Sequence, residues 1–188
     1  LVKLMLVNSG RYNMKRVTTE CGGKTPQIVT GDVPDLDTAV QYAVNGIYGN
    51  QGEVCNAGSR LIVDAKIHDE FVAKFIDKAK KSFNPGDPLD PSTTMGPLVT
   101  REQQKRVLSY IDIGKKEGAK VQLGGGAPKG MDKGCYVSPT LFTGVKNEMR
   151  IAKEEIFGPV TGVIPYKKLD DAIAIANDSI YGLAASIW

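Results

Sequence analysis

The sequence has few of the residues that build metal sites and histidine-based catalytic sites. It contains one histidine, His68, and three cysteines, Cys21, Cys55 and Cys135, none of which lies at metal-ligand spacing. We therefore expect no metal site, and no catalytic pair or triad in which a histidine activates the nucleophile. Three cysteines cannot all pair, so we expect reduced thiols and a cytoplasmic location.

Long apolar runs and strong charge are also missing. No run of about 18 apolar residues occurs, and the N-terminus lacks the apolar core of a signal peptide, so we expect no membrane association. The 24 basic and 21 acidic residues give a formal charge of +3. The densest basic group lies on the polar face of a helical pattern that also carries acids, which predicts a solvated face and no nucleic-acid partner; its members are Lys74, Lys78, Lys80 and Lys81.

What is present is an alternation of short β-like runs with helical patterns. The chain of 188 residues can bury one sizeable core, or one domain with part of a second. The alternation predicts an α/β fold with a mainly parallel sheet and helices on both faces. We expect strands at 27–30, 59–63, 119–123, 159–166 and 183–188, and helices at 35–48, 67–81, 100–114 and 169–177. A capping box of Thr100 and Gln103 opens the third of these helices.

Near the N-terminus, Lys15–Glu20 is strand-like and can belong to a second sheet. The pair Gly22–Gly23 follows it and can form a hinge between domains. The chain begins at Leu1 rather than Met and ends in the apolar run Leu183–Trp188. We therefore expect a piece of a longer protein, truncated at both ends.

The segment Gly49–Arg60 (GNQGEVCNAGSR) places Cys55 in a turn of small and amide residues, just after a helical pattern. A cysteine attacks a carbonyl as the thiolate, and backbone N–H groups in such a turn can stabilise the thiolate and the oxyanion formed on attack. The alternative is a small buried hydrophobic residue, which most free cysteines are.

A second segment, Thr19–Pro26 (TECGGKTP), carries Glu20. This carboxylate can act as a general base on water, or it can be a surface group paired with Lys24 or Arg16. The neighbouring Cys21 is interpreted as a packing residue, and so is Cys135.

A third segment, Glu154–Val160 (EEIFGPV), has two acids, an aromatic ring and a Gly-Pro turn. It is either a helix end followed by a bend, or a source of a carboxylate for ribose hydroxyls and a ring beside a nicotinamide.

Taken together, these three segments resemble the aldehyde dehydrogenase superfamily in their order and spacing. The resemblance continues through PGDPLD, MGPLV, SPTL and NDSIYGLAA and covers essentially the whole chain. The forms ECGGK and NQGEVCNAGSR are most similar to the branch that acts on ω-amino aldehydes such as γ-glutamyl-γ-aminobutyraldehyde.

The resemblance implies a role for four residues. Cys55 occupies the position of the nucleophile, which forms a thiohemiacetal and then a thioester. Glu20 occupies the position of the base that activates the hydrolytic water. Glu155 matches the residue that binds the nicotinamide ribose, and Phe157 the ring near the nicotinamide.

The resemblance also implies the organisation of the protein. Residues 1–22 are expected to be the C-terminal remnant of a cofactor-binding domain, and residues 23–188 an incomplete catalytic domain. The parent enzyme is expected to use NAD or NADP, with NAD favoured, on a small aldehyde and to form a homodimer or homotetramer. The alternative is that the isolated chain is catalytically silent, with at most a residual thiol esterase activity of Cys55.

Overall fold

The computed structural model describes residues 1–188, which form one six-stranded sheet with helices packed on it. The helices are α1 (Val2–Arg11), α2 (Leu36–Tyr48), α3 (His68–Ser82), α4 (Arg101–Lys116), α5 (Arg150–Lys153) and α6 (Leu169–Asn177), with one 3₁₀ turn, η1 (Gly49–Gly52). The strands are β1 (Pro26–Val29), β2 (Arg60–Asp64), β3 (Lys120–Leu123), β4 (Thr140–Thr143), β5 (Val160–Tyr166) and β6 (Ser186–Ile187).

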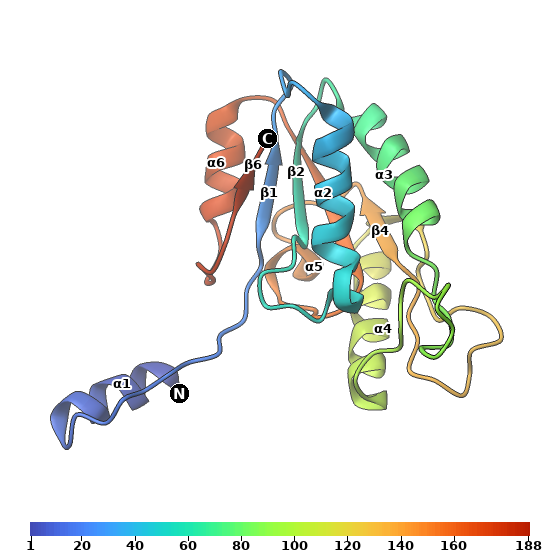
Figure 1. The fold of residues 1–188 in the computed structure, drawn as a ribbon. Helices are drawn as coiled ribbons and strands as arrows, with labels where there is room; N and C mark the ends of the chain where they lie inside the picture. The colour runs from blue at the N-terminus through green and yellow to red at the C-terminus, as the bar shows by residue number, and fades with distance from the viewer.

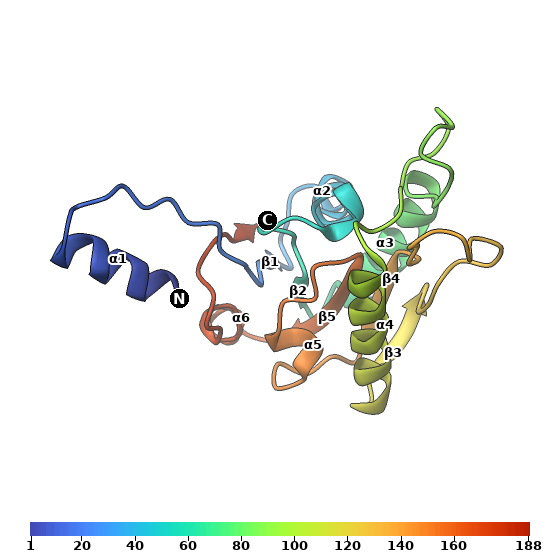
Figure 2. The same cartoon turned by 90° about the horizontal axis from the view of Figure 1, so that it is seen from below.

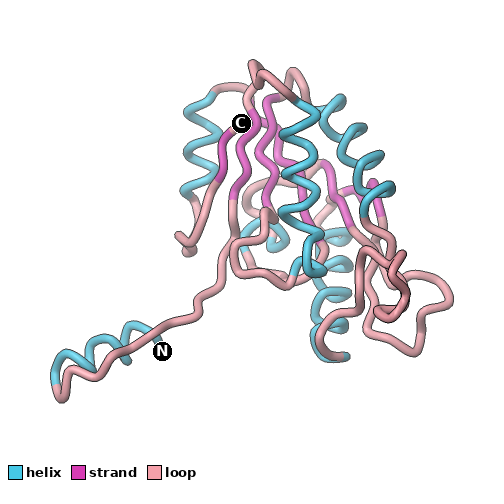
Figure 3. The backbone as a smooth tube through the Cα atoms, viewed as in Figure 1, coloured by secondary structure: helices cyan, strands magenta, loops and turns pink.

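The sheet is mainly parallel, as the alternating pattern predicts. Its strand order is β3-β4-β5-β2-β1-β6, and only the β3–β4 pair is antiparallel. The register pairs Pro26 with Arg60 and Arg60 with Gly162, so β1, β2 and β5 have their amino ends at the same edge. The loops that precede these strands gather below that edge (Figure 3).

Helices cover both faces of the sheet, because successive residues of each central strand point to opposite faces. Leu61 and Val63 of β2 pack in the core under α2 and α3, whereas Ile62 packs with residues of α6 on the other face. A third cluster joins α4 and α5 to β4 and β5. Figure 2 shows α2 and α3 on one side of the sheet and α5 and α6 on the other.

Most expected elements are confirmed, to within a few residues at their ends, and two expectations are wrong. Lys15–Glu20 forms no strand, because it pairs with neither edge strand of the sheet, β3 or β6. The capping box is only half formed: the Gln103 N–H donates to Thr100 Oγ1 at 3.1 Å, but the Gln103 side chain bonds elsewhere.

Three elements were not expected: α1, the four-residue strand β4 and the single-turn helix α5. Both β4 and α5 are too short to show a periodicity in the sequence, and burial in the core stabilises them. Helix α1 has no buried residue and lies apart from the rest of the chain (Figure 1).

Candidate active site

The three motif segments meet at the amino edge of the parallel sheet. Glu20 lies six residues before β1, Cys55 five residues before β2, and Glu155 five residues before β5. Since β1, β2 and β5 are neighbours in the order β5-β2-β1, the loops in front of them are neighbours too. This edge is opposite to the carboxyl edge at which open α/β sheets usually bind ligands.

The loop that carries Cys55 is held in an unusual backbone conformation. Asn50, Gln51 and Gly52 have φ values of 48°, 57° and 72°, a region that costs non-glycine residues about 1–3 kcal/mol each. At Gly52 a Cβ atom would lie 2.2 Å from the Gly158 carbonyl oxygen, so only glycine fits there. The expected turn after a helical segment is present: α2 ends at Tyr48, η1 follows it, and Cys55 lies in a turn with its side chain half-buried.

Two side chains fix this loop to the segment Met95–Val99. Gln51 Oε1 accepts a hydrogen bond from the Gly96 N–H at 3.3 Å, and the Glu53 carboxylate accepts from the Val99 N–H at 3.1 and 3.2 Å. Burial raises the pKa of the Glu53 carboxyl, and the Val99 N–H opposes that shift. These contacts offset part of the strain in the Cys55 loop.

The Gly22–Gly23 pair is explained by close packing. At Gly22 a Cβ would lie 2.2 Å from Glu155 Oε2, and at Gly23 it would lie 2.4 Å from the Cys55 carbonyl oxygen. The Gly23 N–H also donates to Glu155 Oε1 at 3.0 Å. The two glycines therefore let the Glu20 segment contact both other segments at once.

The bend that carries Glu155 and Phe157 is held from helix α4. Phe157 has φ of 60°, which is rare for an aromatic residue. Gln103 Nε2 donates to the carbonyls of Ile156 and Phe157 at 3.1 and 2.6 Å, and Arg106 donates to the Glu155 carbonyl at 2.8 Å. This explains why the Gln103 side chain does not complete the capping box.

The structure distinguishes between the two adjacent acids of the third segment. Glu154 accepts two hydrogen bonds from Arg150, at 2.7 and 2.9 Å, and one from the Tyr110 hydroxyl at 2.7 Å. The bonds from Arg150 first, and then Tyr110, lower the pKa of Glu154 to about 2. Glu154 is therefore held in an ion pair, while Glu155 faces the other two motif segments.

All four residues singled out in the sequence line one open cavity of about 450 Å³. The cavity also includes Gln103, which the sequence marked only as a capping residue, and Arg106, which nothing in a helix surface pattern marks as a site residue. Cys21 was interpreted as a packing residue, but it is exposed and lines the cavity. The complete lining is Glu20, Cys21, Gly22, Cys55, Gln103, Arg106, Glu155 and Phe157.

Lys24 lines a different cavity, of about 340 Å³, and is not the surface partner of Glu20 that the sequence allowed. Its side chain is 2% exposed, and its Nζ has no hydrogen-bond partner. Burial and, next, the charge of Arg60 lower the pKa of Lys24 to about 7, whereas Glu155 and Glu154 act in the opposite direction.

No group of three or more His, Cys, Asp and Glu side chains is placed so that it could hold a metal ion. No helix is long and apolar enough to span a membrane.

A comparison with known families identifies the class of protein to which this fold and these motifs belong. The model of the aldehyde dehydrogenase family matches residues 3–188. The chain therefore belongs to the aldehyde dehydrogenase family.

Among individual relatives, human aldehyde dehydrogenase 1A1 is 50% identical over 186 residues, which are 99% of this chain and 36% of that protein. The chain thus spans just over a third of the length of such relatives.

Solved structures agree with the fold. Indole-3-acetaldehyde dehydrogenase in complex with NAD⁺ superposes with a TM-score of 0.93 and 49% identity, over 100% of this chain and 38% of that chain. γ-Glutamyl-γ-aminobutyraldehyde dehydrogenase from Burkholderia cenocepacia superposes with a TM-score of 0.91 and 46% identity, over 100% of this chain and 37% of that chain. The α/β fold with a mainly parallel sheet is confirmed.

Proposed function

We propose that this chain is the catalytic part of a longer enzyme that oxidises an aldehyde to a carboxylic acid with NAD(P)⁺. The observation that carries the proposal is the convergence of Cys55, Glu20, Glu155 and Phe157 on one cavity from three distant segments. Membership of the aldehyde dehydrogenase family supports it.

In this proposal Cys55 is the nucleophile. Its Sγ attacks the aldehyde carbon, and the carbonyl oxygen becomes the oxyanion of a thiohemiacetal. Loss of hydride from that carbon leaves a thioester on Cys55. Glu20 then takes a proton from a water molecule, the water oxygen bonds to the thioester carbon, and the C–S bond breaks to release the acid and the thiolate.

The residues present fit the nicotinamide end of the cofactor, which supplies the hydride acceptor when bound. Glu155 offers carboxylate oxygens to ribose hydroxyls, and the Gly23 N–H orients that carboxylate at 3.0 Å. The Phe157 ring is 37% exposed at the cavity and can lie beside a planar ring. We favour NAD⁺, because a solved relative binds it.

The finer assignments are proposals of the same kind. We propose an ω-amino aldehyde as substrate, on the motif forms ECGGK and NQGEVCNAGSR and on the likeness to the Burkholderia enzyme. Relatives of similar identity are named for other aldehydes, so the choice is tested with a panel that includes indole-3-acetaldehyde. We further propose that the parent enzyme is a homodimer or homotetramer, and that it is cytoplasmic, a location with which the three free cysteines are consistent.

The function is tested in the full-length enzyme with Cys55→Ala and Glu20→Gln, and with Cys135→Ala as the control. Cys55→Ala should abolish NADH formation. Glu20→Gln should keep a first turnover of NADH but slow the steady state by about 10²-fold or more, because only the hydrolytic step uses the base. Mass spectrometry should then show the acyl group on Cys55. Steady turnover by Cys55→Ala would refute the proposal.

A further inference from the structure

Arg60 is the largest fully buried side chain of the protein. It is the first residue of β2 and lies five residues after Cys55, and it is 1% exposed. No carboxylate lies within ion-pair distance of it, so the side chain is not held by a salt bridge. A buried guanidinium without an acid needs other acceptors.

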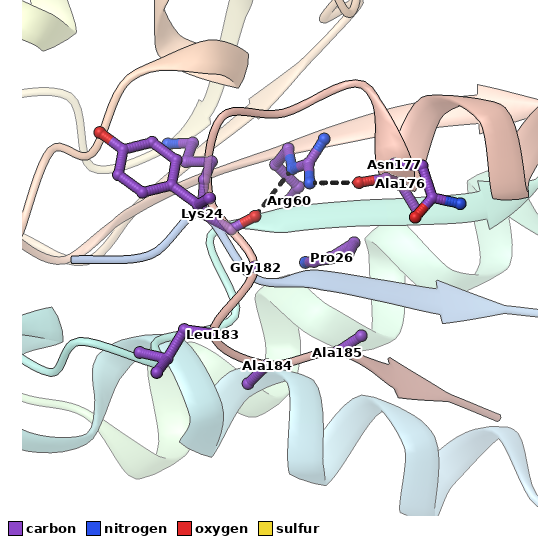
Figure 4. Close-up of a pocket in the computed structure, with 10 residues that line it drawn as sticks. Lys24, Pro26, Arg60, Ala176, Asn177, Gly182, Leu183, Ala184 and Ala185 are labelled. Atoms are coloured by element: carbon purple, nitrogen blue, oxygen red, sulfur yellow. Dashed lines mark hydrogen bonds between the residues drawn. The ribbon is translucent and has the colours of Figure 1, made fainter. Parts of the chain in front are cut away.

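Three backbone carbonyls accept the hydrogen bonds of the Arg60 guanidinium. Arg60 Nε donates to the Lys24 carbonyl at 3.0 Å, and the two terminal nitrogens donate to the carbonyls of Ile175 and Ala176 at 2.9 Å each. Figure 4 shows the guanidinium between the Lys24 carbonyl and the carbonyl of Ala176 near the end of α6. The C-terminal end of a helix is negative, which suits a buried cation.

The bond to Lys24 links Arg60 to the candidate active site. Lys24 follows Gly23, whose backbone lies against the Cys55 carbonyl and the Glu155 carboxylate. Four residues before Lys24 is Glu20. Arg60 therefore connects the segment after the nucleophile to the segment that carries the proposed base.

A second hydrogen bond joins these two segments, this time from a side chain of β1 to the backbone of the segment after Cys55. Gln27, in β1, is 5% exposed, and its Nε2 donates to the Gly58 carbonyl at 3.3 Å, three residues after Cys55. At Gly58 a Cβ would lie 1.6 Å from that nitrogen, so glycine is needed for the contact. The two side chains thus join the same pair of segments from both strands.

We infer that Arg60, together with Gln27, is a positioning residue that fixes Glu20 relative to Cys55 and so controls thioester hydrolysis more than thioester formation. This inference rests on the proposed function. Formation needs Cys55 and the cofactor, and the backbone of the bend that carries Glu155 is held from α4 by Gln103 and Arg106, while Gly23 contributes one bond to the Glu155 carboxylate. Hydrolysis also needs the Glu20 segment at the correct distance, where a displacement of about 1 Å can cost 10²-fold in rate.

The test uses Arg60→Lys in the full-length enzyme, because lysine keeps the charge but cannot reach three carbonyls from one planar group. Arg101→Lys is the matched control, since Arg101 is exposed and bonds only Gln104, Lys133 and Gly134. Rapid-quench and stopped-flow measurements give the rate of the first NADH turnover and the rate of hydrolysis of the acyl-enzyme. Both are normalised to the burst amplitude, which counts folded sites.

We expect Arg60→Lys to slow hydrolysis at least 10-fold and the first turnover less than 3-fold, with acyl-enzyme accumulating on Cys55 by mass spectrometry. A merely structural residue would lower the burst amplitude and leave the ratio of the two rates unchanged. That unchanged ratio overturns the inference.

Where Arg60→Lys gives no burst, Gln27→Asn replaces it, because the shorter amide loses the Gly58 carbonyl but stays polar. In Gln27→Asn, too, hydrolysis is expected to slow more than the first turnover. An unchanged ratio of these two rates overturns the inference. The proposed function fails separately: wild-type enzyme that forms no NADH from any aldehyde of the panel would end that proposal, whatever the variants do.

Discussion

At the scale of single residues, two neighbouring side chains of the same type have different hydrogen-bond partners. Glu154 and Glu155 are adjacent in sequence, but Arg150 and Tyr110 hold Glu154, while Gly23 orients Glu155 toward the cavity. A carboxylate already satisfied by an arginine has little left to offer a ligand. Only Glu155 is therefore expected to affect cofactor binding.

The prediction compares Glu155→Gln with Glu154→Gln in the full-length enzyme. Glu155→Gln should weaken NAD⁺ binding about 10-fold or more, because charge-assisted hydrogen bonds to ribose are worth ~1.5–3 kcal/mol. Glu154→Gln should leave the affinity within about 3-fold. Isothermal titration with NAD⁺ measures both, and equal effects of the two variants would contradict the assignment.

A second residue-scale prediction concerns Lys24. Its pKa is lowered to about 7 in the folded protein from 10.5, mainly by burial. Between these values the unfolded chain keeps a proton that the folded chain releases, so the free energy of unfolding rises with pH through this window. Below pH 7 both states are protonated, and the destabilising effect of the buried charge is fully present.

Lys24→Met removes that effect. Relative to wild type, the variant should be most stabilised below pH 7, and the advantage should shrink by more than ~1 kcal/mol as the pH rises toward 10. Denaturant unfolding at several pH values measures it. Lys105→Met, at an exposed position of α4, should show no such trend. A stability difference independent of pH would count against a buried, shifted lysine.

At the scale of elements, the loops in front of three strands carry the candidate site residues, and the strands fix where the loops meet. The amino ends of β1, β2 and β5 share an edge because all three strands are parallel. The loops then approach so closely that glycine is required at Gly23 and Gly52, and a Cβ at Gly22 would displace the Glu155 carboxylate.

Gly23→Ala tests this contact. The new Cβ would meet the Cys55 carbonyl oxygen, which is backbone and cannot rotate away, so Cys55 itself should move. We expect kcat to fall about 10²-fold, since misplacement of about 1 Å is enough. Gly126→Ala, where nothing lies within 4 Å of the added atom, is the control. Wild-type kcat for Gly23→Ala would show that the loops are not in this contact.

At the scale of the whole molecule, residues 23–188 form the packed unit, and residues 1–22 contain no buried side chain. Helix α1 exposes large apolar side chains on several sides, among them Leu4, Met5, Leu6 and Val7. We propose that residues 1–22 belong to a cofactor-binding domain and residues 23–188 to the catalytic domain. The apolar surface of α1 supports this, because such surface is usually covered.

Limited trypsin digestion of the 188-residue chain checks the division. Cleavage at Arg11, Lys15 and Arg16 should precede cleavage anywhere in residues 23–188, because this stretch has little backbone hydrogen bonding and no burial. Mass spectrometry should first detect a product that begins at Val17. Early cleavage inside the sheet, with Arg11 to Arg16 intact, would contradict the division.

Much of the fold could be predicted from local patterns. The amphipathic helices α2, α3 and α6 and the strands β1, β2 and β5 repeat at helical or strand periods, and a hydrophobic period is a local property. The short β4 and α5 escaped prediction, because tertiary burial rather than propensity stabilises them. The expectation of a strand at Lys15–Glu20 was wrong, because a β-like composition forms a strand only when the segment pairs with another strand.

The sequence by itself determined the family, the types of most elements and the four candidate residues Cys55, Glu20, Glu155 and Phe157, because motif residues and periodicity are readable along the chain. Only the tertiary structure decided that these residues share one cavity, since the strand order β5-β2-β1 joins segments up to 137 residues apart. It also decided that Glu154 is held in an ion pair, that Lys24 is buried, and that Gln103, Arg106 and Arg60 hold the loops. Each of these follows from packing between distant segments, which no local pattern encodes.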